Sequence, residues 1–142
     1  MNPVYDKVLQ YVHKYHGGVA WRLKTHSHVV ELHLNPGEEV IYAFPGQKND
    51  NFWAMFSTCV VCLTNHRILI GQKHLIFGYS LTSITPDLFN DMEVYQGLIW
   101  GKVTIDTIKE VVILTNLDKH SLPDIETNIT QFMMKEKEKY GF

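Results

Sequence analysis

Residues 58–71 read TCVVCLTNHRILIG, and this stretch decides how the rest of the chain is interpreted. The apolar runs CVVCL and RILIG flank the turn-forming residues Thr64 and Asn65, a pattern typical of two antiparallel strands joined by a tight turn. Side chains alternate between the two faces of a strand, so Cys59 and Cys62, three positions apart, are expected to point in opposite directions. We therefore predict that both cysteines are interior strand residues.

The same two cysteines have a chemical interpretation, because CxxC occurs in redox enzymes and in zinc sites. A redox pair needs a helix start to lower its thiol pKa, and a structural zinc site needs further ligands, which no second CxxC supplies. Free cysteine otherwise behaves as a small apolar residue. A cysteine-dependent enzyme that pairs Cys59 or Cys62 with a histidine stays as an alternative, and it predicts a fast-reacting, acidic thiol.

The β pattern continues on both sides of this hairpin. Upstream, the run EVIYAF follows the turn residues Pro36 and Gly37; downstream come HLIFGYSLTSI, DMEVYQGLIWGKVTID and EVVILTNL. Short strands at such close spacing predict an antiparallel sandwich or barrel of about seven strands.

Helical patterns occupy the two ends of the chain. At the N-terminus, Asn2 and Pro3 suit a helix start, and apolar residues recur at helical spacing as far as Tyr15, before Gly17. At the C-terminus, Ser121 and Asp124 have the spacing of a capping pair. The apolar face of this second helix consists of Leu122, Ile125, Ile129, Phe132 and Met133. The segment VAWRLKTHSHVVELHLNPGEEV is open between a short helix and an irregular connector.

Composition favours a single intracellular domain. The 142 residues are 45% hydrophobic and 20% charged, with 13 basic and 15 acidic side chains and a formal charge of −2. This balance predicts no nucleic-acid binding, which needs clustered positive charge. The N-terminus lacks the pattern of a signal peptide, so a cytoplasmic location is expected. Glycine spacing matches no nucleotide-binding fingerprint, and no cofactor is predicted.

In the order of these segments the chain resembles the bacterial pleckstrin-homology-like (PH-like) domains. The resemblance spans roughly residues 36–139 and rests on PGEEVIYAF, CLTNHRILI, LIFGYSLTSI, QGLIWGKVTID, EVVILTNL and the closing SLPDIETNITQFMMKEKEK. It implies a mainly β (α+β) fold: a seven-stranded antiparallel β-sandwich or partly open barrel capped by a C-terminal helix. We expect the PH-like domain at 36–142, preceded by an N-terminal helix and connector at 1–35.

The resemblance also bears on function, because this fold includes lipid-headgroup binders, peptide binders and scaffolds. Lipid-binding relatives commonly carry several Lys and Arg residues in the loop between the first two strands. Here that loop, residues 45–51, has Lys48 as its single lysine, offset by Asp50. The leading prediction is a non-catalytic binding or scaffold domain that recognises a protein partner or self-associates.

Aromatic residues and methionine supply the candidate partner-binding positions, since both residue types are enriched in interface cores. Trp53 and Met55 precede the second strand, and Trp100 lies in a later one. Strand alternation places Trp100 beside Lys102 and Thr104, and it places Ile99 on the opposite, apolar side with Val103 and Ile105.

The runner-up is a module that binds an anionic ligand or a membrane headgroup through Arg67, Lys73 and Lys48. Arg67 follows the tight turn, where its guanidinium suits bidentate binding of a carboxylate or phosphate. The alternative for Arg67 is a structural one, in which it pairs with a neighbouring carboxylate or carbonyl and orders the turn.

Histidines raise the question of a metal site. His26 and His28 lie near Glu31 and His33, but neither a helix nor a strand gathers all four on one face. No metal site is predicted from these residues alone, and the pair His26/His28 stays open as part of a site with a distant third ligand.

Overall fold

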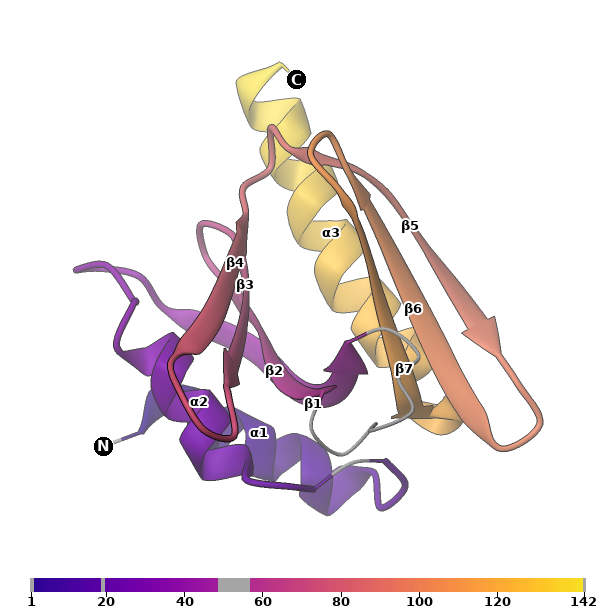
Figure 1. Ribbon diagram of the computed structural model, residues 1–142. Helices are drawn as coiled ribbons and strands as arrows, with labels where there is room; N and C mark the ends of the chain where they lie inside the picture. The colour runs from indigo at the N-terminus through magenta and orange to yellow at the C-terminus, as the bar shows by residue number, and fades with distance from the viewer. Residues whose placement is uncertain (1, 19, 49–56, 142) are drawn as a thin grey trace.

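Seven antiparallel strands form one curved sheet that curls into a half-barrel around the C-terminal helix (Figure 1). The computed structural model describes residues 2–18, 20–48 and 57–141. The sheet order is β4-β3-β2-β1-β7-β6-β5, which confirms the predicted seven-stranded, partly open barrel. The strands are β1 Val40–Lys48, β2 Thr58–Thr64, β3 Ile68–Lys73, β4 Tyr79–Ile84, β5 Phe89–Gln96, β6 Trp100–Thr107 and β7 Val111–Asp118.

The turn in the opening stretch forms as the sequence predicts. Strands β2 and β3 pair antiparallel around it, and the N–H groups of His66 and Arg67 both donate to Thr64 Oγ1 at 3.1 Å. All seven residues of β2 are buried. A strand buried on both faces needs apolar residues at every position, which explains the uninterrupted CVVCL run.

The two faces of β2 belong to different cores. Cys59, with Val61, packs into the core around the C-terminal helix, whereas Cys62, with Val60, packs into a second core on the other side of the sheet. The predicted opposite orientation of the two cysteines is therefore confirmed.

Helix α3, Leu122–Tyr140, fills the concave side of the sheet. Its residues Ile125, Ile129 and Met133 are fully buried there. The expected capping pair does not form: Ser121 makes no side-chain cap and instead donates from Oγ to the Asp118 carbonyl at 2.7 Å. Its hydroxyl is committed to the short 3₁₀ turn Lys119–Ser121 that precedes α3.

Helices α1, Pro3–Lys14, and α2, Leu23–Glu31, cover the other face of β1 to β3. The segment VAWRLKTHSHVVELHLNPGEEV, for which the sequence allows a short helix or an irregular connector, therefore contains helix α2. Helix α1 ends three residues before Gly17. The two helices are joined directly, because Glu31 Oε2 accepts the N–H groups of Val4 and Tyr5 at 3.0 and 3.2 Å. A carboxylate from α2 thus satisfies two otherwise unpaired donors at the start of α1.

The half-barrel stays open beside β1. This strand pairs with β2 along its length but with β7 only through Gln47 and Lys48. The edge strands of the sheet are β4 and β5, so the barrel is not closed.

Candidate functional site: the apolar hairpin tips

Two strand connections expose large apolar side chains. They are the β3–β4 turn and the β5–β6 turn, which belong to the two halves of the curled sheet. Figure 1 shows the two turns at the lower left and lower right of the half-barrel. We call them the apolar tips: residues 75–77 in the β3–β4 turn and residues 98–100 at the β5–β6 turn.

The β3–β4 tip projects Leu75, Ile76 and Phe77 into solvent. Phe77 is 85% exposed and Ile76 75% exposed, although both are large apolar residues. The turn is closed by a 3.1 Å hydrogen bond from the His74 N–H to the Gly78 carbonyl. Gly78 has a φ of 71°, a conformation that glycine adopts without strain. The exposure therefore follows from a defined turn.

The β5–β6 tip contains Leu98, Ile99 and the first residue of β6, Trp100. Leu98 is 89% exposed, Ile99 65% and Trp100 46%. The Gly97 N–H donates to the Trp100 carbonyl at 2.9 Å, and Lys119 Nζ donates to the Leu98 carbonyl at 3.0 Å. The prediction that Ile99 lies on the apolar side of a strand is wrong, because the chain turns at residues 97–99 and β6 begins only at Trp100.

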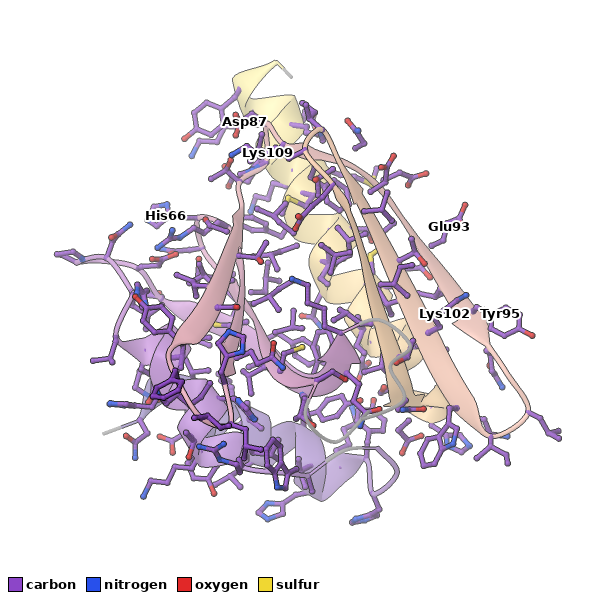
Figure 2. All side chains as sticks on the ribbon, viewed as in Figure 1. His66, Asp87, Glu93, Tyr95, Lys102 and Lys109 are labelled. Carbon is purple, nitrogen blue, oxygen red and sulfur yellow. The ribbon has the colours of Figure 1, made fainter. Side chains whose placement is uncertain are left out.

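Lysines border the tips. Lys73 ends β3 opposite Tyr79, and Lys102 pairs with Tyr95 across the β5–β6 hairpin. The Lys102 ammonium lies 5.7 Å from the centre of the Tyr95 ring, and Figure 2 shows the two side chains together on this hairpin. Lys119 is the third lysine, held against Leu98 as described above.

The predicted anion-binding residues do not converge. Lys48 and Lys73 are the last residues of β1 and β3, whereas Arg67 lies in the β2–β3 turn, at the other end of β3. Figure 2 shows its neighbour His66 there. The β1–β2 register is consistent with this separation, because Gln47 near the end of β1 pairs with Thr58 at the start of β2, whereas Val40 at the start of β1 pairs with Thr64 beside the turn.

The Arg67 guanidinium is already occupied. Its Nε and Nη2 donate to the two carboxylate oxygens of Glu38 at 2.9 and 3.0 Å, Nη2 also donates to the His33 carbonyl, and Nη1 donates to Ser83 Oγ. These contacts match the structural alternative for Arg67, in which it orders the turn.

Neither cysteine has the ionised thiol that nucleophilic chemistry needs. Burial raises the pKa of both Cys59 and Cys62 to about 12, so both thiols stay protonated at neutral pH.

His26 and His28, the two histidines considered for a metal site, lie in different environments on α2. His26 is fully buried and its Nδ1 accepts the Lys73 N–H at 2.9 Å, whereas the exposed His28 lies 3.8 Å from Glu31. Burial, with Arg22 nearby, lowers the pKa of His26 to about 4, so this ring is neutral at physiological pH. Among residues 2–18, 20–48 and 57–141, no three His, Cys, Asp or Glu side chains are grouped to hold a metal.

Of the predicted partner-binding residues, the structure places Trp100 at a tip. Trp53 and Met55 lie outside the described residues. Sequence periodicity does not reveal the tip residues 75–77, because the run HLIFGYSLTSI predicts one continuous strand. Its length of eleven residues and the internal Gly78 are the signals that indicate a turn within it.

Comparison with known proteins identifies the family. The sequence model of the bacterial PH domain family matches residues 34–131, which is most of the chain. The chain belongs to this family. The crystal structure of a pleckstrin homology domain from Shewanella amazonensis SB2B is similar to the fold, with a TM-score of 0.51 and 15% sequence identity over 88% of this chain and 97% of that one. No curated protein matches the chain.

Membership of the bacterial PH domain family supports a binding or scaffold domain in general terms. PH-like domains are generally non-catalytic, and they commonly bind proteins or lipids. No helix in the described part of the chain is long and apolar enough to span a membrane. The family match starts at residue 34, so α1 and α2 precede it.

Proposed function

We propose that this bacterial PH domain is a non-catalytic binding module that docks onto another protein through its apolar tips. The observation that supports the proposal is the near-complete exposure of Phe77 and Leu98 on turns with defined hydrogen bonds. Burying one such side chain at an interface contributes about 1.5–3 kcal/mol. Contiguous exposed apolar residues on a soluble surface commonly mark interaction sites.

The composition of the tips fits a protein partner. Trp100 and the neighbouring Tyr95 are of the residue types that dominate binding energies in protein interfaces. Lys73 and Lys102 supply the polar rim that surrounds the apolar core of such interfaces.

The test is site-specific crosslinking in cells of the source organism. A photoreactive amino acid replaces Leu98 in one form, and in a matched control it replaces Ile108. Ile108 is also an exposed apolar turn residue, at 66%, but it lies in the β6–β7 turn, beyond the other end of β6 from Leu98. We expect one defined protein to crosslink from position 98 and not from position 108.

Binding to that protein, once purified, is then measured by calorimetry for the wild type and for Phe77→Ser, Leu98→Ser and Trp100→Ala. Each substitution is expected to weaken binding about tenfold or more, with unchanged circular dichroism. Identical crosslinks from positions 98 and 108, or undiminished binding by all three variants, overturns the proposal. If the crosslinked protein is a second copy of this chain, sedimentation velocity must show a dimer that Leu98→Ser dissociates.

A second candidate function is docking onto an anionic membrane surface, and the observation that favours it is the lysine border of the tips. Aromatic and aliphatic side chains insert at the headgroup level while lysines attract anionic lipids. Vesicle flotation tests it. Binding to phosphatidylglycerol vesicles that weakens with salt, with Lys102→Gln and with Leu98→Ser supports this function. Equal behaviour toward neutral phosphatidylcholine vesicles, or no flotation at low salt, contradicts it.

A further inference from the structure

The two edge strands of the sheet, β4 and β5, differ in how their free edges are protected. Proteins commonly protect an edge with a bulge, charged side chains or proline, because an open edge pairs readily with other chains. Strand β5 has a register shift between Phe89 and Asp91, and it carries the charges of Asp91 and Glu93. Strand β4 pairs with β3 without any register shift, and its sequence YSLTSI contains neither a charge nor a proline. The edge of β4 is therefore the one that remains open to pairing.

The register of the sheet identifies the backbone groups that face this edge. In antiparallel pairs, residues that bond to one neighbouring strand alternate with residues whose N–H and C=O groups point the other way. The Thr64 N–H donates to the Arg67 carbonyl at 2.9 Å, so Leu69 bonds toward β2 and the next residue, Ile70, bonds toward β4. Ile70 pairs with Thr82. Thr82 therefore bonds toward β3, and the residues on either side of it bond outward.

By this alternation Tyr79, Leu81 and Ser83 direct three N–H and three C=O groups away from β3. The bond from the His74 N–H to the Gly78 carbonyl, at 3.1 Å, gives the same alternation from the other end of the hairpin. Tyr79 and Ser83 are exposed and Leu81 is half-buried, so the edge is accessible to another molecule. In the described part of the chain, β4 pairs with no strand other than β3.

A cleft of about 240 Å³ runs along the second half of this edge. Its near wall is β4 from residue 81 to residue 84, and its far wall consists of Leu88 and the β6–β7 turn. The Ile108 N–H donates to the Leu88 carbonyl at 2.9 Å, which fixes this turn to the β4–β5 connection. Figure 2 shows Lys109 of the turn next to Asp87 of the connection. A wall opposite the edge leaves room for one extended chain, whereas the edge of another folded sheet would bring its own neighbouring elements with it.

The cleft offers apolar and polar contacts to such a chain. Ile84 and Leu88 belong to the core around α3, and they form the apolar part of the lining. Lys109 and Glu110 form none of the ion pairs found among the described residues, so both charges are available. Side chains of an added strand would alternate between the concave side of the sheet, above these apolar residues, and the outer side.

We propose that the free edge of β4 binds an extended segment of another protein, which adds to the sheet as a further antiparallel or parallel strand. Main-chain hydrogen bonds to Tyr79, Leu81 and Ser83 would supply affinity, and the cleft would select apolar side chains at alternate positions. This inference goes beyond the proposed function, because the edge and the cleft contain none of the apolar-tip residues.

The experiment selects displayed peptides of about ten residues, the upper end of strand length, on the full-length protein. Peptides that bind are then synthesised, and their affinities are measured by calorimetry for the wild type and for Ser83→Pro. Proline at position 83 removes an outward N–H without removing a hydrogen bond to β3, so the fold should persist. We expect Ser83→Pro to bind the peptides at least tenfold more weakly, with an unchanged circular dichroism spectrum.

Ser83→Ala is the matched control. Both variants lose the Ser83 hydroxyl, which accepts a hydrogen bond from Arg67, but alanine keeps the outward backbone N–H. Ser83→Ala should therefore bind the peptides with the affinity of the wild type. Leu98→Ser, which tests the tips, should also leave peptide binding unchanged, so failure at one surface is distinguishable from failure at the other.

Amide hydrogen exchange in the wild type tests the edge without any substitution. In the free protein, the amides of Tyr79, Leu81 and Ser83 should exchange fast, and those of Ser80 and Thr82, which bond to β3, should exchange slowly. A bound peptide should slow exchange at the first three positions.

Four outcomes overturn the proposal. They are slow exchange at all five positions in the free protein, selection of no binding peptide, protection by the peptides at positions other than the β4 edge, and equal affinity of Ser83→Pro and the wild type. A wild-type dimer in sedimentation velocity that Ser83→Pro dissociates would assign the edge to a second copy of this chain, which also contradicts the proposal.

Discussion

At the residue scale, Arg67 and Glu38 tie three segments of the fold together. The Glu38 carboxylate accepts hydrogen bonds from Arg67, from the Asn35 N–H at 3.0 Å and from Thr64 Oγ1 at 2.6 Å. Arg67 in turn reaches Ser83 on β4. The Glu38 side chain is fully buried and that of Arg67 nearly so. Breaking a buried ion pair by removing one partner leaves the other charge uncompensated, which makes this pair a point of sensitivity.

The pair makes stability depend on pH in a defined direction. Burial alone would raise the pKa of Glu38, but the hydrogen bonds from Arg67, the Asn35 N–H and Thr64 outweigh it and lower the pKa from 4.5 to about 2. A carboxyl whose pKa is lower in the folded state contributes stability above its unfolded pKa and loses it as the pH falls. This contribution is therefore complete above about pH 5 and is lost between about pH 4.5 and pH 2.

We predict that Glu38→Gln lowers the free energy of unfolding at pH 7 by about 2–3 kcal/mol, because Arg67 loses its counter-charge. The variant should also show a flatter decline of stability between pH 5 and pH 2 than the wild type. Urea unfolding at a series of pH values measures both. The control is Glu39→Gln, a neighbouring exposed carboxylate, which should retain the wild-type stability and slope. A Glu38→Gln curve parallel to that of the wild type contradicts the assignment.

At the element scale, the close packing of α2 against β3 depends on Gly71. A Cβ built at Gly71 would lie 2.5 Å from Val30 Cγ2, 3.3 Å from Val29 Cγ1 and 3.4 Å from the His26 carbonyl oxygen. Valine is stiff about χ1, and the His26 carbonyl belongs to the helix backbone. Relief of the clash therefore requires α2 to move outward, which would disturb the His26 hydrogen bond to Lys73.

We predict that Gly71→Ala lowers the free energy of unfolding by about 1–3 kcal/mol through overpacking. Val30→Ala alone should also destabilise, because it opens a cavity in the second core. The double variant should lose less free energy of unfolding than the two single variants lose together, because the shorter side chain at residue 30 makes room for the new methyl group. Additive effects in this double-mutant cycle would show that the contact between residues 30 and 71 does not limit how closely α2 packs against β3. Gly37→Ala is not a control for packing, because its φ of 82° adds strain.

Sequence patterns predict the elements better than the turns that carry the candidate site. The strands, both terminal helices and the opposite faces of Cys59 and Cys62 follow from local periodicity. The apolar tips do not, because exposed Leu, Ile and Phe residues look like strand interior in a one-dimensional pattern. Local periodicity also does not identify the partner of Arg67, because Glu38 lies 29 positions away in the sequence. Pairings across the sheet depend on topology, which local periodicity does not encode.

At the scale of the whole molecule, the sheet has a core on each face. The α3 side contains the core of the half-barrel, and the opposite face of β1 to β3 is covered by α1 and α2. Ala43, Val60, Cys62 and Leu69 on that face are all completely buried. A family pattern that begins at residue 34 therefore includes strands whose outer face is apolar, while the helices that cover this face precede it.

We predict that residues 1–35 are required for a stable monomeric domain, so that they are not a detachable arm. A chain truncated to 36–142 would expose the outer face of β2 and lose the Lys73 hydrogen bond to His26, so it should aggregate or unfold cooperatively at a much lower temperature than the full chain. Thermal unfolding and size-exclusion chromatography measure both effects. Adding residues 1–35 as a separate peptide should restore part of the stability, because helix packing supplies most of it. A truncated chain that stays monomeric with an unchanged melting temperature would show that the half-barrel is self-sufficient and that α1 and α2 are an accessory.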